Sequence, residues 1–137
     1  MTTILAPKIL LAVAGGGALG AMARYVTMSL MGHFAGAAFP WGTLFVNVTG
    51  SFLMGALVEF GVTRWAMTPE TRAFLVVGVL GGFTTFSTFT LDIVTLMERH
   101  VSFGAFLYVL LSVTLGLAAF FAALVVVRFL WPAPGVS

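Results

Sequence analysis

The sequence has no cysteine, and charged side chains are scarce: its 137 residues include six Lys or Arg and four Asp or Glu, together 7% of the total. The lack of cysteine excludes a disulfide framework, a thiolate metal site and a cysteine nucleophile. Soluble domains carry roughly 25% charged residues, so a soluble globular fold is excluded as well. Six basic residues are also too few for the positive surface with which proteins bind nucleic acids.

Apolar residues fill the chain instead. Hydrophobic residues account for 61% of it, and the mean hydropathy is +1.15, which indicates an integral membrane protein surrounded by lipid. A helix needs about 20 residues to cross a bilayer, so a chain of this length forms four spans in one transmembrane domain, 1–137, with no room for a soluble catalytic domain. We expect an all-α protein that is not an enzyme, with spans at about 9–31, 41–62, 72–97 and 103–130.

The basic residues near the span ends favour one orientation in the membrane only weakly. One side of the predicted topology holds Lys8, Arg64, Arg72 and Arg128, and the other holds Arg99, with Arg24 if its side chain reaches that interface. Lys and Arg in short loops set the orientation of membrane proteins, and a ratio this small allows both. The sequence therefore permits a population inserted in both directions.

Small and polar residues recur every four positions in three of the predicted spans, and so share one face of each helix. The rows are Ala12, Gly16, Gly20 and Arg24; Thr43, Asn47, Ser51, Gly55 and Glu59; and Gly104, Tyr108, Ser112 and Gly116. Such faces let membrane helices pack closely. Asn47 stands out because a mid-span amide must meet a polar partner, an ion or water. A structural hydrogen bond between helices is the alternative to an ion-binding role.

The third span contains a polar segment, "GVLGGFTTFSTFTLD" at 78–92, within an otherwise apolar run. Two adjacent glycines lower helix propensity, and the hydroxyl groups that follow compete for backbone hydrogen bonds. We predict that the helix unwinds at 82–85. Unwound backbone is tolerated inside a membrane only where it is buried in protein or faces a water-filled cavity, and its carbonyl and amide groups can then hold ions.

Two aromatic residues follow this segment three positions apart, Phe86 and Phe89. The edge of an aromatic ring is electropositive, so rings directed into a narrow path would favour an anion over a cation. The alternative is that they are ordinary core or lipid-facing rings. Glu59 and Asp92 lie toward span ends, where interfacial solvation or pairing with an Arg is expected. Arg24 either extends to the interface or lines the entrance of an anion path.

Three segments together resemble the signatures of the Fluc, or CrcB, fluoride channels, in order and spacing: "GGGALGAMARY", "WGTLFVNVTGSFLMG" and "GVLGGFTTFSTFTLD". The resemblance implies passive conduction of fluoride out of the cytoplasm, which protects the cell because hydrogen fluoride enters as a neutral acid and ionises inside. It also implies a multi-pass protein of the bacterial cytoplasmic (inner) membrane, surrounded by lipid. The implied assembly is an antiparallel, dual-topology homodimer with two pores and a broken third helix.

The same resemblance implies roles for individual residues. A sodium ion at the dimer centre would be held by the backbone carbonyls of Gly81 and Thr84. The ion pathway would comprise Asn47, Phe86 and Phe89, a polar track of Thr43, Ser87, Thr88, Tyr108 and Ser112, and Arg24 at the vestibule. One position departs from the family pattern, because Gly116 stands a turn beyond Ser112 where a hydroxyl is common. The resemblance therefore assigns no residue to the far end of the polar track.

Two other functions fit parts of the sequence. A small four-span, proton-coupled drug or cation exporter would need a carboxylate embedded in the membrane. The first span has none, and Glu59 and Asp92 lie near span ends. A scaffold subunit would need only the small-residue faces, and it would leave Asn47 and the hydroxyl-rich segment without a role.

Overall fold

The computed structural model describes residues 6–63 and 66–132, and its regular elements in these ranges are all helical. The elements are α1 (Pro7–Ala35), α2 (Trp41–Thr63), α3 (Pro69–Arg72), the π-helix η1 (Ala73–Leu80), α4 (Gly81–Phe83), α5 (Phe86–Glu98) and α6 (Ser102–Leu130). The segment Pro69–Glu98, from the start of α3 to the end of α5, is called the third span below.

Four segments in the described part of the chain are long and apolar enough to cross a membrane: Pro7–Ala35, Trp41–Gly61, Pro69–Glu98 and Ser102–Leu130. Their number agrees with the sequence prediction, and their ends lie a few residues from the predicted ones. The first span was predicted to end at 31, but α1 continues to Ala35. It ends at Gly36, whose φ of 78° suits glycine. Arg64 and the tail from 133 lie outside the described residues.

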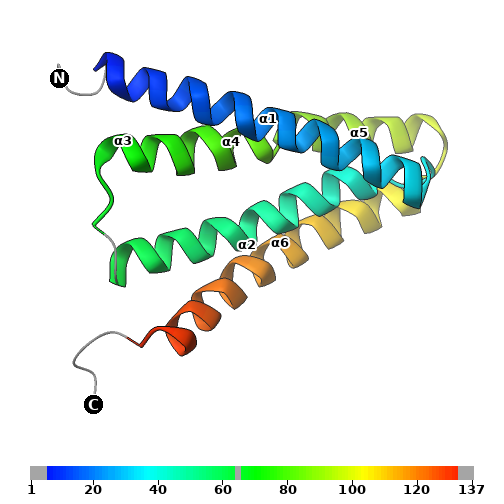
Figure 1. Ribbon diagram of the computed structural model, residues 1–137. Helices are drawn as coiled ribbons and strands as arrows, with labels where there is room; N and C mark the ends of the chain where they lie inside the picture. The colour runs from blue at the N-terminus through cyan, green and yellow to red at the C-terminus, as the bar shows by residue number, and fades with distance from the viewer. Residues whose placement is uncertain (1–5, 64–65, 133–137) are drawn as a thin grey trace.

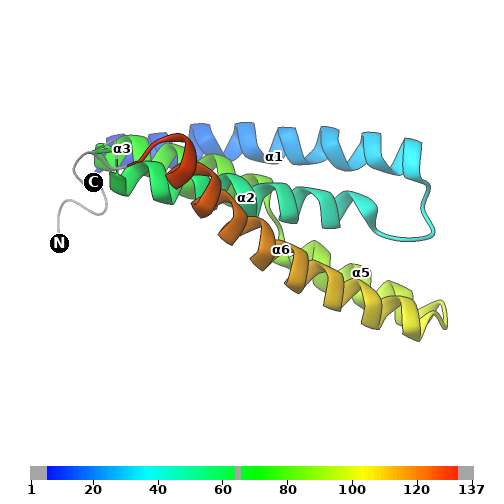
Figure 2. The same ribbon diagram turned by 90° about the horizontal axis from the view of Figure 1, so that it is seen from below.

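The four spans run in alternating directions, so the start of α1 and the end of α6 lie at the same end of the molecule (Figure 1). Lys8 and Arg72 are therefore at one end with Arg128, and Arg99 is at the other. Figure 2 shows the third span changing direction along its length. Its first half, η1 and α4, packs against α1, whereas α5 packs against α6. The two halves of this span thus have different neighbours.

Close packing between α1 and the third span depends on the predicted row of small residues. Gly16 and Gly20 are buried in α1. A Cβ atom added to Gly16 would clash with the carbonyl oxygen of Phe74, and one added to Gly20 would clash with that of Val79. The two backbones touch because neither glycine has a side chain, which is how small residues drive helix association in lipid.

Gly20→Ala is expected to destabilise the protein, because its methyl group would meet backbone atoms of Val79 and Phe83 that cannot move aside cheaply. Overpacking of this kind costs about 1–3 kcal/mol. Gly17→Ala is the matched control, since a Cβ at Gly17 has no atom within 4 Å. Thermal unfolding in detergent, followed by circular dichroism, should show a lower midpoint for Gly20→Ala alone. Equal midpoints for the two variants would contradict this packing.

A second packing centre joins α2, α5 and α6. Its buried residues are Leu44, Leu96, Ala105 and Tyr108, and partly buried apolar side chains, including Phe89, pack around them. Tyr108 and Thr43 are among the most deeply buried side chains in the described chain. This cluster holds α5 against α6 and fixes the position of the segment that precedes α5.

Candidate functional site

Two residues with extended backbone, Thr84 and Thr85, separate α4 from α5. Thr84 has φ −80° and ψ 159°, and Thr85 has φ −152° and ψ 126°. The Thr85 hydroxyl accepts a hydrogen bond from the Thr88 N–H at 3.2 Å, which caps the first turn of α5. It also donates to the Thr88 Oγ1 at 3.1 Å, and the exposed Ser87 hydroxyl lies 3.4 Å away. Gly82 and Phe83 were expected to unwind too, but they remain helical.

Asn47 of α2 bonds to both polar backbone groups of Thr85. Its Nδ2 donates to the Thr85 carbonyl at 2.9 Å, and its Oδ1 accepts from the Thr85 N–H at 2.8 Å. In a continuous helix that N–H would bond to the Gly81 carbonyl instead. The asparagine side chain thus replaces a helical hydrogen bond, and one hydrogen of its NH2 group is not used in this pair.

Arg24 of α1 approaches the same segment from another helix. Its Nη1 donates to the Thr84 carbonyl oxygen at 3.1 Å. The side chain is half-buried, and this bond ties it to the third span. Arg24 is also not among the residues that line the two cavities described next.

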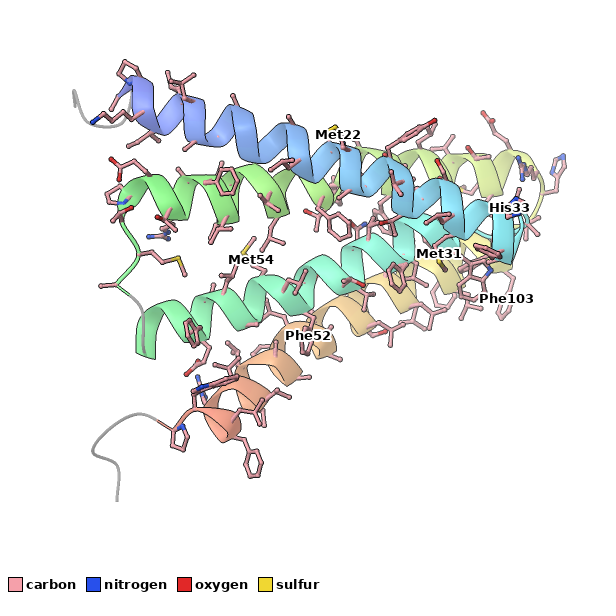
Figure 3. All side chains as sticks on the ribbon, viewed as in Figure 1. Met22, Met31, His33, Phe52, Met54 and Phe103 are labelled. Atoms are coloured by element: carbon pink, nitrogen blue, oxygen red, sulfur yellow. The ribbon has the colours of Figure 1, made fainter. Side chains whose placement is uncertain are left out.

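A cavity of about 370 Å³ lies beside Thr84 and Thr85. It is lined by Asn47, Gly50, Ser51, Met54, Thr84, Thr85, Phe86, Phe89, Ser112, Val113 and Phe120. Figure 3 shows Met54 directed from α2 toward the third span, with Phe52 on the other side of the helix. The structure therefore brings Asn47, both predicted phenylalanines and Ser112 to one space.

Two serines line this cavity, Ser51 of α2 and Ser112 of α6. The Ser112 oxygen is buried and has no hydrogen-bond partner among the described residues. A Cβ added to Gly116 would lie 3.6 Å from the Ser51 oxygen, so Ser51 supplies a hydroxyl close to the position where the family pattern expected one. Sequence reasoning placed Ser51 on the polar face of its span but did not assign it to the site.

Three aromatic rings form a continuous row along α5 and α6. The ring centroids of Phe86 and Phe89 are 5.7 Å apart, and those of Phe89 and Tyr108 are 5.2 Å apart. Phe86 is 79% exposed in the single chain, although it borders the cavity. The ring row leads from the cavity toward Tyr108.

A second cavity, of about 230 Å³, is lined in part by Thr43, Asp92 and Arg99. Tyr108 contacts Phe89 of the first cavity with its ring. Its hydroxyl donates to the Asp92 Oδ2 at 3.0 Å, and its ring also meets Phe39 of the second cavity edge to face. Asp92 was expected to be solvated or paired with an Arg; its side chain is half-buried, and its carboxylate accepts from Tyr108. The sequence missed this pair because its members are 16 residues apart on different helices.

Glu59, which was also expected to be solvated or paired with an Arg, forms such a pair. Arg128 Nη2 lies 2.9 Å from Glu59 Oε2, and the side chains are 64% and 10% exposed, respectively. This ion pair joins α2 to α6 at the end of the molecule where α6 finishes.

Backbone oxygens, and not acidic side chains, are the ligands available to a cation here. No group of three or more His, Asp or Glu side chains in residues 6–63 and 66–132 could hold a metal ion. The Gly81 carbonyl loses its helical partner to Asn47, because the Thr85 N–H points there. The Thr84 carbonyl accepts from Arg24 and retains a second lone pair.

Comparison with known proteins gives consistent matches over most of the chain. The family described as "CrcB-like protein, Camphor Resistance (CrcB)" matches residues 11–124. The fluoride-specific ion channel FluC of Rhodospirillum centenum is 54% identical over 121 residues, covering 88% of this chain and 96% of the relative. The proteins of the same name from Rhizobium meliloti and Nitrobacter winogradskyi are 50% and 49% identical over 119 residues, covering 87% of this chain and 95% and 94% of those proteins.

Proposed function

The chain belongs to the CrcB family, and from that premise we propose that it is a passive, fluoride-selective channel and not an enzyme. It would carry fluoride out of the cytoplasm across the bacterial cytoplasmic membrane. The observation that carries the proposal is the extended Thr84–Thr85 segment, which Asn47 holds beside a cavity bordered by Phe86 and Phe89. The function thus rests on one site within the membrane.

The groups around the cavity suit fluoride, a small and strongly hydrated anion. A selective pore must replace the water around the ion with compact hydrogen-bond donors. The unused amide hydrogen of Asn47 and the unpartnered hydroxyl of Ser112 are such donors, and the electropositive ring edges of Phe86 and Phe89 add weaker attraction. We propose that fluoride passes from this cavity along the rings to Tyr108, with Ser87 and Thr88 near its path and Thr43 on the far side.

The nearest alternative, a proton-coupled exporter, requires a membrane carboxylate that can gain and lose a proton during transport. Glu70 and Glu98 lie at the two ends of the third span, and the other two carboxylates in the described spans are engaged, Glu59 with Arg128 and Asp92 with Tyr108. These pairings favour the channel over the exporter.

The working unit we propose is an antiparallel homodimer of two copies inserted in opposite directions. Phe86 and Gly81 are exposed in the single chain, and a second copy would cover both. An apolar cavity of about 430 Å³ between the third span and the α2–α6 pair adds apolar surface for burial. The weak charge asymmetry of the loops is compatible with insertion in both directions.

A sodium ion at the dimer centre also fits the chain. Unwound backbone carbonyls are known ligands for sodium in membrane proteins, and Gly81 and Thr84 each offer one with a lone pair that no helical bond uses. Each chain supplies two oxygens, so a second copy would have to supply the rest. The bound ion would contribute a fixed positive charge that favours anions.

The test of the proposed function is ion efflux from lipid vesicles that contain only this protein. We expect rapid fluoride release, measured with a fluoride electrode, and no comparable chloride release. A channel should need no proton gradient, whereas an exporter should stop when the gradient is collapsed. Absence of fluoride release, or equal release of chloride, would reject the proposal.

The antiparallel assembly predicts that forcing one orientation removes function. Arg99→Gln should favour one direction, and a variant with Lys8, Arg64 and Arg72 changed to Gln and Ser102→Lys should favour the other. Each alone is expected to lose most fluoride resistance in cells that lack another fluoride exporter, and co-expression should restore it. Full activity of either variant by itself, with its single orientation verified by labelling, would contradict an antiparallel dimer.

A further inference from the structure

The extended Thr84–Thr85 segment is held by side chains from two different helices. Successive residues of an extended chain direct their groups to opposite sides. Arg24 of α1 donates to the Thr84 carbonyl, and Asn47 of α2 donates to the Thr85 carbonyl. The two consecutive carbonyls thus have donors from two helices, α1 and α2.

Glycine packing fixes the position of Arg24. Gly20 and Gly16 lie one and two turns before it on the same face of α1, and both touch backbone of the third span. These contacts set the distance between the helices at the level of the extended segment. The guanidinium therefore reaches the Thr84 carbonyl from a backbone that packing already holds in place.

The other groups of Thr84 also have contacts that hold them in place. Its hydroxyl donates to the Leu80 carbonyl at 2.9 Å, and its N–H bonds to the same oxygen at 3.0 Å. Its methyl group occupies the space left by the missing side chain of Gly50 in α2. The carbonyl is the remaining polar group of Thr84, and Arg24 donates a hydrogen bond to it.

We propose that Arg24 is a positioning residue, which fixes the extended Thr84–Thr85 segment through its hydrogen bond to the Thr84 carbonyl. A charged side chain near the middle of a membrane helix raises the free energy of the folded protein when it has no polar partner. This cost opposes breaking of the hydrogen bond between Arg24 and the Thr84 carbonyl. Arg24 lines neither cavity, so its effect on transport passes through Thr84. The inference rests on the proposed function only for its transport measurement.

The competing role for Arg24 is electrostatic attraction of anions to the entrance of the pore. Attraction raises the local concentration of fluoride, so its loss is overcome when fluoride is abundant. Loss of a positioning contact lowers the maximal flux instead, and it loosens the backbone at Thr84 and Thr85. These consequences can be measured separately.

The experiment compares Arg24→Met, which keeps the length of the side chain and removes its charge and donors, with Arg24→Lys, which keeps both. Hydrogen exchange of the segment 84–88 in the full-length protein is the first readout, and fluoride flux at low and saturating fluoride is the second. Arg24→Met should raise the exchange rate and lower the maximal flux, each by about tenfold. Arg24→Lys should restore most of both. Tyr25→Phe is the control, because Tyr25 lies beside Arg24 on α1, is 73% exposed and lines neither cavity.

Unchanged exchange in Arg24→Met, with a flux deficit that disappears at saturating fluoride, would overturn the proposal in favour of attraction. If Arg24→Met does not fold, Arg24→Gln replaces it, since the shorter amide side chain falls short of the carbonyl and should give the same rise in exchange. If the wild-type protein carries no fluoride, the proposed function fails, and the exchange rates still decide whether Arg24 holds the segment.

Discussion

Asn47→Leu is expected to reduce fluoride flux by about a hundredfold or more. Leucine has nearly the same shape as asparagine, but it can neither donate to the Thr85 carbonyl nor accept from the Thr85 N–H. Each buried backbone group left without a partner costs about 1–3 kcal/mol, so the extended conformation would no longer be favoured over a continuous helix. The substitution also removes the amide donor proposed to face fluoride. Efflux from vesicles measures the loss.

The matched control is Thr49→Val, two residues further along α2. It removes a hydroxyl without changing side-chain shape, and Thr49 lines neither of the two cavities beside Tyr108. Its flux should stay near that of the wild type. Size-exclusion chromatography should show that Asn47→Leu still assembles. A loss of flux can then be attributed to the ion pathway and not to loss of the assembly. Undiminished flux in Asn47→Leu would remove this residue from the pathway.

Phe86→Ile is expected to cut conduction by about tenfold, because an aliphatic side chain has no electropositive ring edge. It also ends the ring contact with Phe89, whose centroid lies 5.7 Å away. The residue borders the cavity, so the change acts where fluoride is proposed to pass. Fluoride efflux at matched protein content, with chloride efflux alongside, measures both the rate and the selectivity.

Two variants distinguish the effect of losing the ring edge from the effect of changing the size of the side chain. Phe86→Tyr keeps the aromatic ring and should retain most of the flux. Phe106→Ile makes the same change on α6 at a residue that is 65% exposed and lines no cavity named above, so it should conduct normally. Wild-type flux in Phe86→Ile would leave no support for the ring-edge argument.

The polar segment of the third span illustrates how far the sequence could lead. Glycines and hydroxyls indicated lost helix near 82–85, whereas the extended residues are Thr84 and Thr85 only. The narrower range has a physical cause. The Thr85 hydroxyl caps α5, and the Asn47 side chain forms hydrogen bonds with both the N–H and the carbonyl of Thr85. The capping pattern is local and could be seen in the sequence. The bonds to Asn47 span 38 residues and could not.

Composition and residue spacing by themselves determined the membrane environment, the four spans and the glycine faces, because each depends on hydropathy or helix period within one segment. Tertiary structure alone decided that Arg24 meets the Thr84 carbonyl, that Tyr108 meets Asp92, and that Ser51 lies beside Gly116. The physical reason is that a hydrogen bond depends on the distance and angle between two atoms, and helix packing sets these for residues far apart in the chain.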